Sequence, residues 1–408
     1  MKHAMSCENI DFFNHLNWRF TKHLLSCFGA WPFQTLRLRR VIRSVVFILV
    51  SSLFIPEILR IITVRKNANL LVECVPIFVF HFLTVTKMLQ CLLNLKKIEQ
   101  LLIQIRRDWE SSLSSIEAEI LNSNGQQNRI LIHTYVYFIY SVTVVYMSTP
   151  MVPKLFDFII PLNESRPKVN LYETEYYVDS ETYELPILLH SYIITPFPTT
   201  IILAFDTLYV SCVHHGSIMF AIVGFLCFRH RLQNLSGQKN EQNTWENGKT
   251  DGTIRNYHSL ANCIAKHKEV IEYAELLEST YTTSMIAIVG MNTLAISITG
   301  LQTILKINEP SEMIRFGTYT VGQVVHLFFL SWPSQKLIDE SERIFQSTYQ
   351  GEWYALPPKL RSCYVLIMMR GGKPCALTAG RYYTMSLQSF SQVVKTAVSY
   401  CTVLLSLQ

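Results

Sequence analysis

Charged residues are scarce in this chain. Asp, Glu, Lys and Arg make up only 16% of the 408 residues, and Gly and Pro number 15 each, whereas hydrophobic residues reach 49%. A typical soluble domain carries about a quarter charged residues, so this composition excludes a soluble multidomain protein and indicates an integral membrane protein. The net charge of +6 is not gathered into one basic cluster with interleaved aromatic residues. Nucleic acid is therefore not expected as a partner.

Patterns for metal binding, disulfides and catalysis are also missing. The ten cysteines occur singly, without a CxxC pair, and none lies in the long loop from Met151 to Pro186. No disulfide framework and no zinc site is expected. The twelve histidines lack metal-ligand spacing, so we predict no metal, no cofactor, no catalytic residue and no enzyme activity. The absence of an internal repeat argues against a transporter.

Long runs almost free of charge are what the sequence has instead. A bilayer core of about 30 Å needs roughly 20 helical residues. Seven segments reach this length, and three of them carry charges only near their ends. The predicted spans are residues 41–62, 70–90, 130–153, 185–205, 279–305, 316–335 and 382–407.

Two charged residues and one further apolar run need an interpretation. We expect the Lys87 side chain to extend toward water at the membrane edge. Asp206 is interpreted as an acid at the inner interface, with a functional acid inside the membrane as the alternative. The run from Thr207 to Phe228 is an eighth span or the continuation of one long helix from Ile187 to His230. We favour the long helix, which would measure about 66 Å.

The charges of the loops orient the spans. Basic residues are retained on the cytoplasmic side. Residues 1–40 hold six basic side chains against two acidic ones and lack the apolar run of a signal peptide, and residues 336–381 hold seven against four. Residues 151–186 hold three against seven and carry the glycosylation sequon Asn163-Glu164-Ser165, which is used only outside. We predict a cytoplasmic N-terminus and an extracellular C-terminus, opposite to G-protein-coupled receptors.

The predicted fold class is an all-α integral membrane protein with seven transmembrane helices. Polar residues at about 231–256 predict a flexible loop, and amphipathic patterns after this loop and after the sixth span predict cytoplasmic helix extensions. These extensions suggest an assembly platform, and helices lying on the membrane surface are the alternative. The chain then divides into a cytoplasmic N-terminal segment (1–40), helices one to six with the ligand pocket (41–335), a cytoplasmic assembly segment (336–381) and a pore-lining helix (382–408).

The last span carries a stripe that is polar at its inner end and apolar at its outer end. Residues at intervals of three or four share one helix face, and here they are Gln392, Thr396, Ser399, Val403 and Leu407. A water-filled pore that narrows to a hydrophobic gate needs such a face. Packing of small polar residues against neighbouring helices is equally compatible with the spacing. Lys395 lies on a different face and is interpreted as a snorkelling anchor.

Motifs in the last third of the chain resemble insect odorant receptors. The segment 331–335 (SWPSQ) is followed by Glu340-Ser341, Tyr349 and Trp353, and the tail carries 384–390 (TMSLQSF) and then 398–400 (VSY). The resemblance implies an odorant-gated, non-selective cation channel in olfactory signalling. It is a tetramer in which each subunit contributes its seventh helix to a central pore, with Val403 and Leu407 at the gate positions. The short second cytoplasmic loop resembles a divergent tuning subunit rather than the shared co-receptor.

The same resemblance implies partners and a location. The partners are an odorant co-receptor subunit in a heterotetramer of open stoichiometry, a small volatile hydrophobic ligand, permeating monovalent and divalent cations, and membrane lipid. The location is the plasma membrane of olfactory sensory neurons. A gustatory receptor-type channel is the alternative, but Ser399-Tyr400 is followed here by Ser406-Leu407 and not by the gustatory tail. An inverted metabotropic receptor is the second alternative.

The resemblance also implies a ligand site between helices two, three, four and six, in the outer half of the membrane. Aromatic walls with a few hydroxyl groups suit small apolar ligands, and ordinary helix packing is the alternative for each residue. The candidates are Phe80, Thr84, Tyr137, Tyr140, Ser141, Val144, Met147, Tyr192, Thr195, Phe316, Tyr319, Thr320 and Gln323. Pro196 and Pro198 are expected to kink the fourth helix and open space there.

Overall fold

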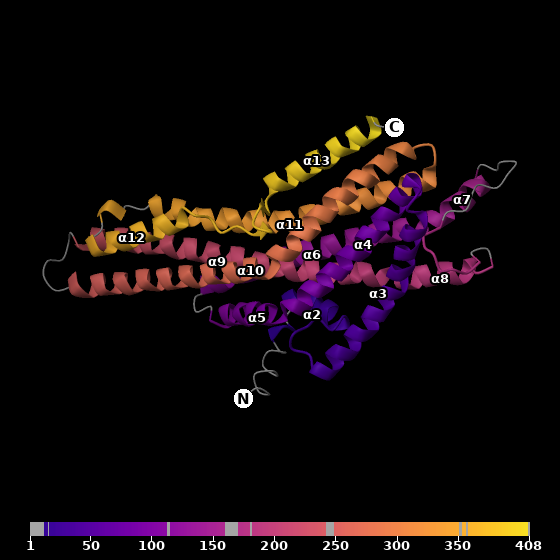
Figure 1. Ribbon diagram of the computed structural model, residues 1–408. Helices are drawn as coiled ribbons and strands as arrows, with labels where there is room; N and C mark the ends of the chain where they lie inside the picture. Colours follow the sequence, from indigo (N-terminus) through magenta and orange to yellow (C-terminus); the bar gives the residue numbers. More distant parts are fainter. Residues whose placement is uncertain are drawn as a thin grey trace.

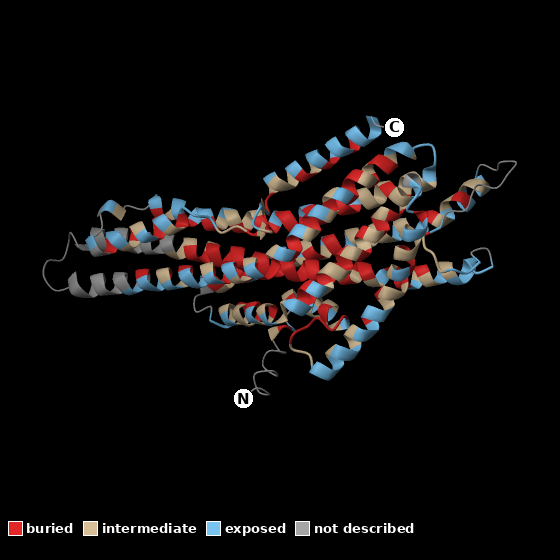
Figure 2. Ribbon diagram, viewed as in Figure 1, coloured by how far each residue is buried: buried red, intermediate tan, exposed pale blue. Residues whose placement is uncertain are grey.

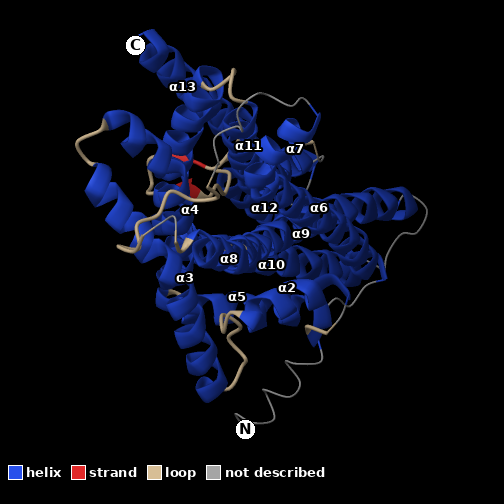
Figure 3. Cartoon of the chain, turned by 90° about the vertical axis from the view of Figure 1, so that its right-hand side faces the viewer, coloured by secondary structure: helices blue, strands red, loops and turns tan. Residues whose placement is uncertain are grey.

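The described part of the chain is a long helical bundle. The computed structural model describes residues 12–14, 16–111, 115–159, 170–179, 182–241, 249–350, 353–355 and 358–406. These ranges are helical apart from loops and one short hairpin (Figures 1 and 3). Asn163 and Leu407, the predicted glycosylation site and one predicted gate residue, lie outside them.

Twelve α-helices are described. In chain order they are α2 (Leu16–Cys27), α3 (Leu36–Val64), α4 (Ala68–Leu93), α5 (Leu95–Glu110), α6 (Ser115–Ser148), α7 (Val152–Ile159), α8 (Glu184–Ile194), α9 (Pro196–Glu241), α10 (Lys249–Leu305), α11 (Pro310–Tyr349), α12 (Pro358–Gly371) and α13 (Leu387–Ser406). Two 3₁₀ turns, η1 (Thr149–Met151) and η2 (Trp353–Ala355), and two strands, β1 (Thr378–Ala379) and β2 (Tyr383–Thr384), complete the described elements.

Three helices are much longer than a membrane is thick. α9, α10 and α11 have 46, 57 and 40 residues, which correspond to about 69, 86 and 60 Å. They run side by side away from α3 and α4 to the end of the molecule where α12 lies (Figure 1). Both ends of the predicted flexible loop at about 231–256 are helical, because α9 continues to Glu241 and α10 starts at Lys249. Extending an existing helix adds one hydrogen bond per residue without a new nucleation cost.

α9 forms the centre of the bundle. Every residue from Ile201 to Phe220 is buried, and this stretch is red in Figure 2. The helix packs against α4, α6, α10 and α11, so all its sides face protein, as expected of a helix without a polar face. α9 is one continuous helix from Pro196 to Glu241, which agrees with the interpretation that the run from Thr207 to Phe228 continues the fourth helix.

The fourth helix is broken near its outer end. α8 ends at Ile194 and α9 begins at Pro196, with Thr195 between them. Pro196 and Pro198 cannot donate a backbone hydrogen bond, and their rings clash with the preceding turn. The helix is interrupted where the two prolines lie, and the predicted kink stays a prediction.

Five helical segments are long and apolar enough to cross a membrane among the described residues. They are Leu36–Val64, Leu70–Leu93, Ile116–Ile159, Glu184–Leu226 and Leu260–Leu305. The two remaining predicted spans are helical in α11 and α13, but they do not reach the same apolarity. Both helices carry polar side chains within the predicted spans, among them His326, Gln392 and Ser399.

A hairpin fixes the start of α13. Thr378 pairs with Thr384 and Ala379 with Tyr383, so the last helix begins at Leu387 and not at residue 382 as predicted. The hairpin is tied to α10, because the Thr378 backbone N–H donates to Glu278 Oε2 at 2.7 Å and the Gly380 N–H donates to the Thr282 carbonyl at 2.9 Å. The pairing of these short strands takes the residues before Leu387 out of the helix.

Gly380 is expected to tolerate no side chain. Its φ of +63° favours glycine, and a Cβ there would lie 2.6 Å from Ile286 Cδ1. Gly380→Ala should lower the free energy of unfolding by about 1–3 kcal/mol, seen as a lower midpoint in thermal unfolding of the purified protein. Gly290→Ala is the control, since a Cβ at that position meets nothing within 4 Å. Equal midpoints for both variants would show that the hairpin does not depend on this turn.

Candidate ligand-binding site

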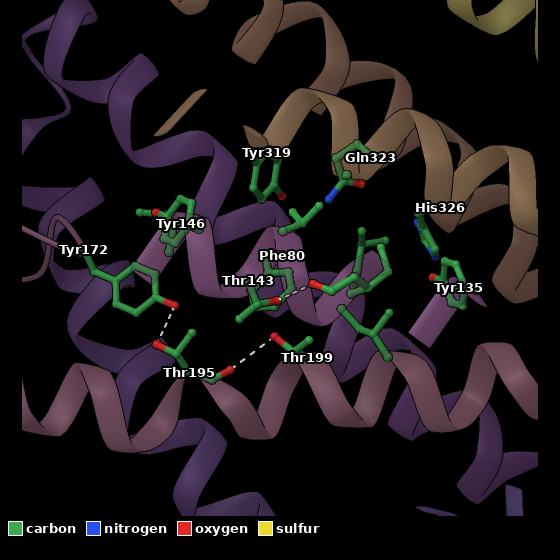
Figure 4. A pocket seen from close by; sticks show the side chains of 16 residues that line it. Phe80, Tyr135, Thr143, Tyr146, Tyr172, Thr195, Thr199, Tyr319, Gln323 and His326 are labelled. Carbon is green, nitrogen blue, oxygen red and sulfur yellow. Dashed lines mark hydrogen bonds between the residues drawn. The ribbon is translucent and has the colours of Figure 1, made fainter. Parts of the chain in front are cut away.

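A cavity lies between α4, α6, α9 and α11, beside the break between α8 and α9 (Figure 4). Its volume is about 90 Å³. Sixteen side chains line it: Ile77, Phe80, Leu83, Tyr135, Ile139, Val142, Thr143, Tyr146, Tyr172, Thr195, Thr199, Ile202, Tyr319, Gly322, Gln323 and His326. The wall is mainly aromatic and aliphatic, which suits a small apolar molecule.

Most hydroxyl groups of the wall are already engaged. The Tyr319 hydroxyl donates to the Pro76 carbonyl at 2.7 Å, and Thr143 and Thr199 bond to carbonyls one helical turn earlier, at 2.9 and 3.3 Å. Tyr172 and Thr195 share a hydrogen bond of 2.8 Å, drawn as a dashed line in Figure 4. These groups therefore present largely satisfied surfaces to the cavity.

Gln323 differs from these hydroxyl groups. Its Oε1 is buried and has no hydrogen-bond partner within the described part of the chain. A buried carbonyl oxygen without a donor costs about 1–3 kcal/mol of desolvation. A ligand that donates a hydrogen bond would remove this penalty, so Gln323 is the polar group of the wall best placed to select a ligand.

One end of the cavity borders a buried charged cluster. The Tyr135 hydroxyl donates to Asp206 Oδ2 at 3.0 Å, and His326 Nε2 lies 3.2 Å from the same oxygen. Lys87 Nζ contacts Asp206 Oδ1 and lies 3.0 Å from His326 Nε2. The Lys87 and Asp206 side chains are only 2% and 3% exposed. We call Lys87, Tyr135, Asp206 and His326 the buried charge cluster.

The cluster corrects two sequence-based interpretations. Lys87 does not extend toward water, because its ammonium group is buried against Asp206. Asp206 is not an exposed interfacial acid, because it is enclosed by α4, α6 and α11. A pair of opposite charges removes much of the cost that either charge would have alone. The sequence around Lys87 and around Asp206 did not indicate that α4 and α9 meet at these two residues.

The tautomer of His326 follows from a neighbour on α10. Asn292 donates its side-chain N–H to the Ile288 carbonyl at 2.9 Å, which turns its Oδ1 toward His326 Nδ1 at 3.3 Å. An amide oxygen only accepts, so Nδ1 carries the hydrogen. His326 thereby links the cavity wall to α10, the helix on which α13 packs.

Four of the thirteen predicted ligand residues line the cavity: Phe80, Thr195, Tyr319 and Gln323. Several others have partners elsewhere. Thr84 bonds to the Phe80 carbonyl, Tyr140 to Thr200, Tyr192 to the Met147 carbonyl, and Thr320 to Thr299. Phe316 is buried outside the cavity lining, and Tyr137, Ser141 and Val144 are exposed.

The difference on α6 is one of rotation. The predicted face was Tyr137, Tyr140, Ser141, Val144 and Met147, whereas the lining residues are Tyr135, Ile139, Val142, Thr143 and Tyr146. Both sets have helical spacing, and they differ by one or two residues, which is a rotation of roughly 100–200°. Within the predicted span, α6 has apolar residues of its own on every side. Its sequence pattern therefore does not indicate which side faces protein.

Other lining residues were missed for separate reasons. Tyr172 lies in the loop after α7, far in sequence from the predicted pocket. Tyr135 and His326 join the cavity to the buried charge cluster. For His326 a signal existed, because an ionisable side chain within an apolar span is a functional hypothesis by default. No group of three or more potential metal ligands occurs among the described residues.

α13 lies along the outside of the bundle, beside α10 and α11 (Figures 1 and 2). Its buried residues are Val393, Ala397 and Cys401, and the helix packs on α10 and α11. The predicted pore face is exposed at its four described members, Gln392, Thr396, Ser399 and Val403. Lys395 is also exposed. The predicted face is therefore available to another molecule or to water.

The fold and the cavity define a class: a helical protein with membrane-capable helices and a mainly apolar internal site. The profile of the family described as 7tm Odorant receptor matches residues 67–398. The chain belongs to the odorant receptor family, which is not a family of enzymes. The resemblance seen in the C-terminal motifs is confirmed.

Individual relatives are distant. Odorant receptor Or2 of Anopheles gambiae is 25% identical over 55% of this chain and 56% of its own length. The odorant receptor coreceptor of Drosophila melanogaster is 22% identical over 36% of this chain and 30% of its own length. The chain thus spans about half the length of these curated relatives, or less. A divergent tuning subunit rather than the co-receptor fits these matches.

A solved structure shares the fold. The olfactory receptor OR5 of Machilis hrabei in complex with eugenol has a TM-score of 0.75 and 13% identity, with 96% of this chain and 97% of that chain covered. A second structure of the same receptor gives a TM-score of 0.74. The helical architecture is therefore that of an insect olfactory receptor.

Proposed function

We propose that the chain is a tuning subunit of an odorant-gated, non-selective cation channel that assembles with a co-receptor subunit into a heterotetramer. The observation that carries the proposal is the cavity between α4, α6, α9 and α11, whose wall is mainly apolar and includes one buried acceptor without a partner among the described residues, Gln323 Oε1. Family membership supports the receptor role. A gustatory receptor-type channel and an inverted metabotropic receptor remain the alternatives.

The proposed ligand is a small volatile molecule with one hydrogen-bond donor. Gln323 Oε1 accepts from that donor, and the aromatic wall contacts the apolar remainder. Phe80, Thr195 and Tyr319 are proposed as contacts from the same cavity. The OR5 receptor, which shares the fold, was solved in complex with eugenol.

The proposed topology has seven membrane helices, a cytoplasmic N-terminus and an extracellular C-terminus. Five apolar segments supply the first five spans, and α11 and α13 supply the last two. Lower apolarity is acceptable in these two helices if they face protein, ligand or water rather than lipid. The extensions of α9, α10 and α11, together with α12, form the proposed cytoplasmic assembly platform. The proposed location is the plasma membrane of olfactory sensory neurons, with Asn163 glycosylated outside.

The proposed pore is lined by Gln392, Thr396, Ser399 and Val403 of α13, with Leu407 beyond the described residues. Monovalent and divalent cations pass this polar face, and Val403 and Leu407 close it by dewetting. Exposure of the four described residues supports this arrangement. Lys395 remains a proposed anchor.

Val403→Ala should widen the constriction and raise the basal current of cells that express this subunit with its co-receptor, because a shorter side chain lowers the barrier to wetting. Whole-cell currents without odorant measure the effect. Val398→Ala, an exposed position outside the predicted stripe, is the control. Basal currents that match the wild type in Val403→Ala would count against α13 as the gate.

The ligand proposal is tested with paired odorants. Cells that express the subunit and the co-receptor are exposed to a panel of volatile alcohols and to hydrocarbons of the same shape, and currents are recorded. Alcohols should activate at lower concentration. Gln323→Leu should raise their half-maximal concentration about tenfold, the equivalent of one hydrogen bond of roughly 1.4 kcal/mol, and leave the hydrocarbons unchanged.

Gln350→Leu, at the exposed end of α11, controls for expression in this experiment. An equal shift for alcohols and hydrocarbons in Gln323→Leu would reject the hydrogen bond but not the cavity. Failure of every odorant to open a current in cells that carry both subunits at the surface would reject the channel proposal.

A further inference from the structure

Four arginines are concentrated at the start of α3. Arg37, Arg39, Arg40 and Arg43 occur within seven residues. None of them forms an ion pair with a carboxylate among the described residues, in contrast to Arg60 at the other end of the same helix, which lies 3.3 Å from Glu173. The concentration of positive charge at this corner of the molecule is therefore uncompensated by the described residues.

The helix end adds to this positive charge. α3 has no acidic residue in its first turn, and Thr35 at its N-cap makes no side-chain cap bond. The N-terminus of a helix carries a partial positive charge, so acids are favourable there and arginines are unfavourable. An anion bound at this corner would offset both the charge of the arginines and the partial charge of the helix N-terminus.

The arginines are held in place by the loop that precedes the helix. Arg43 Nε donates to the Gly29 carbonyl at 2.8 Å, and Arg39 donates to the Pro32 carbonyl at 3.1 Å. Gly29 has φ of +61°, and a Cβ there would lie 2.8 Å from the Arg39 carbonyl. Only a residue without a side chain lets the loop approach this closely. The loop uses one nitrogen of Arg43, whereas its Nη2 is buried and has no partner in the described ranges.

Two apolar grooves border this corner. One, of about 340 Å³, lies between the loop, α3, α4 and α9, and Arg43 is part of its wall together with Phe47, Met88 and Phe205. The other, of about 420 Å³, lies on the opposite side of α3 and reaches Pro196 and Phe197 at the start of α9. Phe28 belongs to both grooves. The start of α3 stands away from the bundle in Figures 1 and 3.

We propose that this corner binds an anionic glycerophospholipid of the inner leaflet. The phosphate group contacts Arg43 and its neighbours Arg39 and Arg40, and the acyl chains lie in the two grooves beside α3. Charge complementarity favours an anionic headgroup over a neutral one. The grooves favour a lipid over a free phosphate, because their walls are apolar and continue along the exposed, apolar side of α3, where Val45 and Ile48 lie.

The proposal rests on the proposed cytoplasmic side of α2 and α3, since anionic lipids and basic residues meet at that surface. It does not require channel activity. Each basic side chain near an anionic membrane surface contributes about fivefold in affinity, so the loss of two arginines is expected to weaken binding roughly thirtyfold.

The experiment uses the purified full-length chain in nanodiscs that contain phosphatidylcholine alone or phosphatidylcholine with phosphatidylserine. After gentle extraction, native mass spectrometry counts the lipids that remain bound. The wild-type protein should retain phosphatidylserine in preference to phosphatidylcholine, and R40Q/R43Q should lose this preference. Lys96→Gln, an exposed basic residue at the start of α5, is the matched control and should behave as the wild type. Thermal midpoints in phosphatidylcholine verify that each variant is folded.

A single variant and a test with free phosphate complete the lipid experiment. Arg40→Gln alone changes an exposed side chain, so it tests the charge even if the double variant does not fold. Inorganic phosphate added to detergent-purified protein separates a free anion from a lipid, and it should not raise the thermal midpoint as phosphatidylserine does. Equal retention of both lipids by the wild type, or undiminished phosphatidylserine on Arg40→Gln and the double variant, would overturn the proposal. A midpoint rise with phosphate equal to that with lipid would also overturn it.

Discussion

Asp206→Ala is expected to lower the free energy of unfolding by about 3–5 kcal/mol, because it leaves the Lys87 ammonium group buried without its counter-charge. Asp206 also accepts from Tyr135 and lies beside His326, so three side chains lose a partner at once. The readout is the thermal midpoint of the purified protein in detergent and the amount at the cell surface. Asp339→Ala is the control, because Asp339 is exposed on α11.

A double variant that removes both charges of the Lys87–Asp206 pair distinguishes a loss of charge pairing from a loss of packing. Lys87→Met combined with Asp206→Leu removes both charges and keeps the unbranched shape of the first side chain and the branching at Cγ of the second. Replacement of a buried ion pair by apolar residues is often neutral or stabilising, so the double variant should recover most of the stability that Asp206→Ala loses. If Lys87→Met/Asp206→Leu is as unstable as Asp206→Ala, the pair is not the cause, and hydrogen bonds of Tyr135 and His326 would have to account for the loss.

Gly322→Leu is expected to abolish or strongly weaken odorant activation with little effect on folding. Gly322 lines the cavity from α11, and a Cβ there would lie 3.1 Å from Val142 Cγ1. A leucine side chain would occupy much of a cavity of about 90 Å³. A bound odorant and the leucine would together overfill the cavity, which costs about 1–3 kcal/mol of binding, equivalent to a rise of roughly 5- to 150-fold in the half-maximal odorant concentration.

The control for this prediction is Gly224→Leu. Gly224 is also helical, and a Cβ there meets nothing within 4 Å, so both substitutions improve helix propensity equally. Val142→Ala combined with Gly322→Ala should restore activation relative to Gly322→Ala, because it removes the methyl group that the new Cβ would meet. Wild-type responses in Gly322→Leu at normal surface levels would show that the odorant binds elsewhere.

Asp206→Ala and Gly322→Leu test two adjoining sites, the buried charge cluster and the cavity. Tyr135 and His326 belong both to the cavity wall and to the buried charge cluster. The Tyr135 ring is stacked on Phe329, with centroids 3.6 Å apart, and this fixes one end of the cavity. A ligand at that end therefore contacts side chains whose positions depend on Lys87 and Asp206.

The sequence by itself determined the class of protein and most of the helices. In a membrane, an apolar run of about 20 residues forms a helix, because the helix satisfies all of its backbone hydrogen bonds within the same segment. The C-terminal motifs determined the family. Pro196 and Pro198 determined the break in the fourth helix, because the effect of proline on a helix is local. Helix ends were less certain, as at Leu387, where pairing with a distant hairpin sets the boundary.

The tertiary structure alone decided which sides of the helices meet. Gln323 and Tyr319, which the sequence offered as ligand residues, line the cavity, whereas the cavity meets a different side of α6 from the one proposed. A helix that is apolar all round carries no pattern that orients it. Lys87 and Asp206 are 119 residues apart, and nothing local in either span indicates that they pair. Their charges are stable in the interior only because α4 and α9 bring them into contact, and that contact is a property of the assembled bundle.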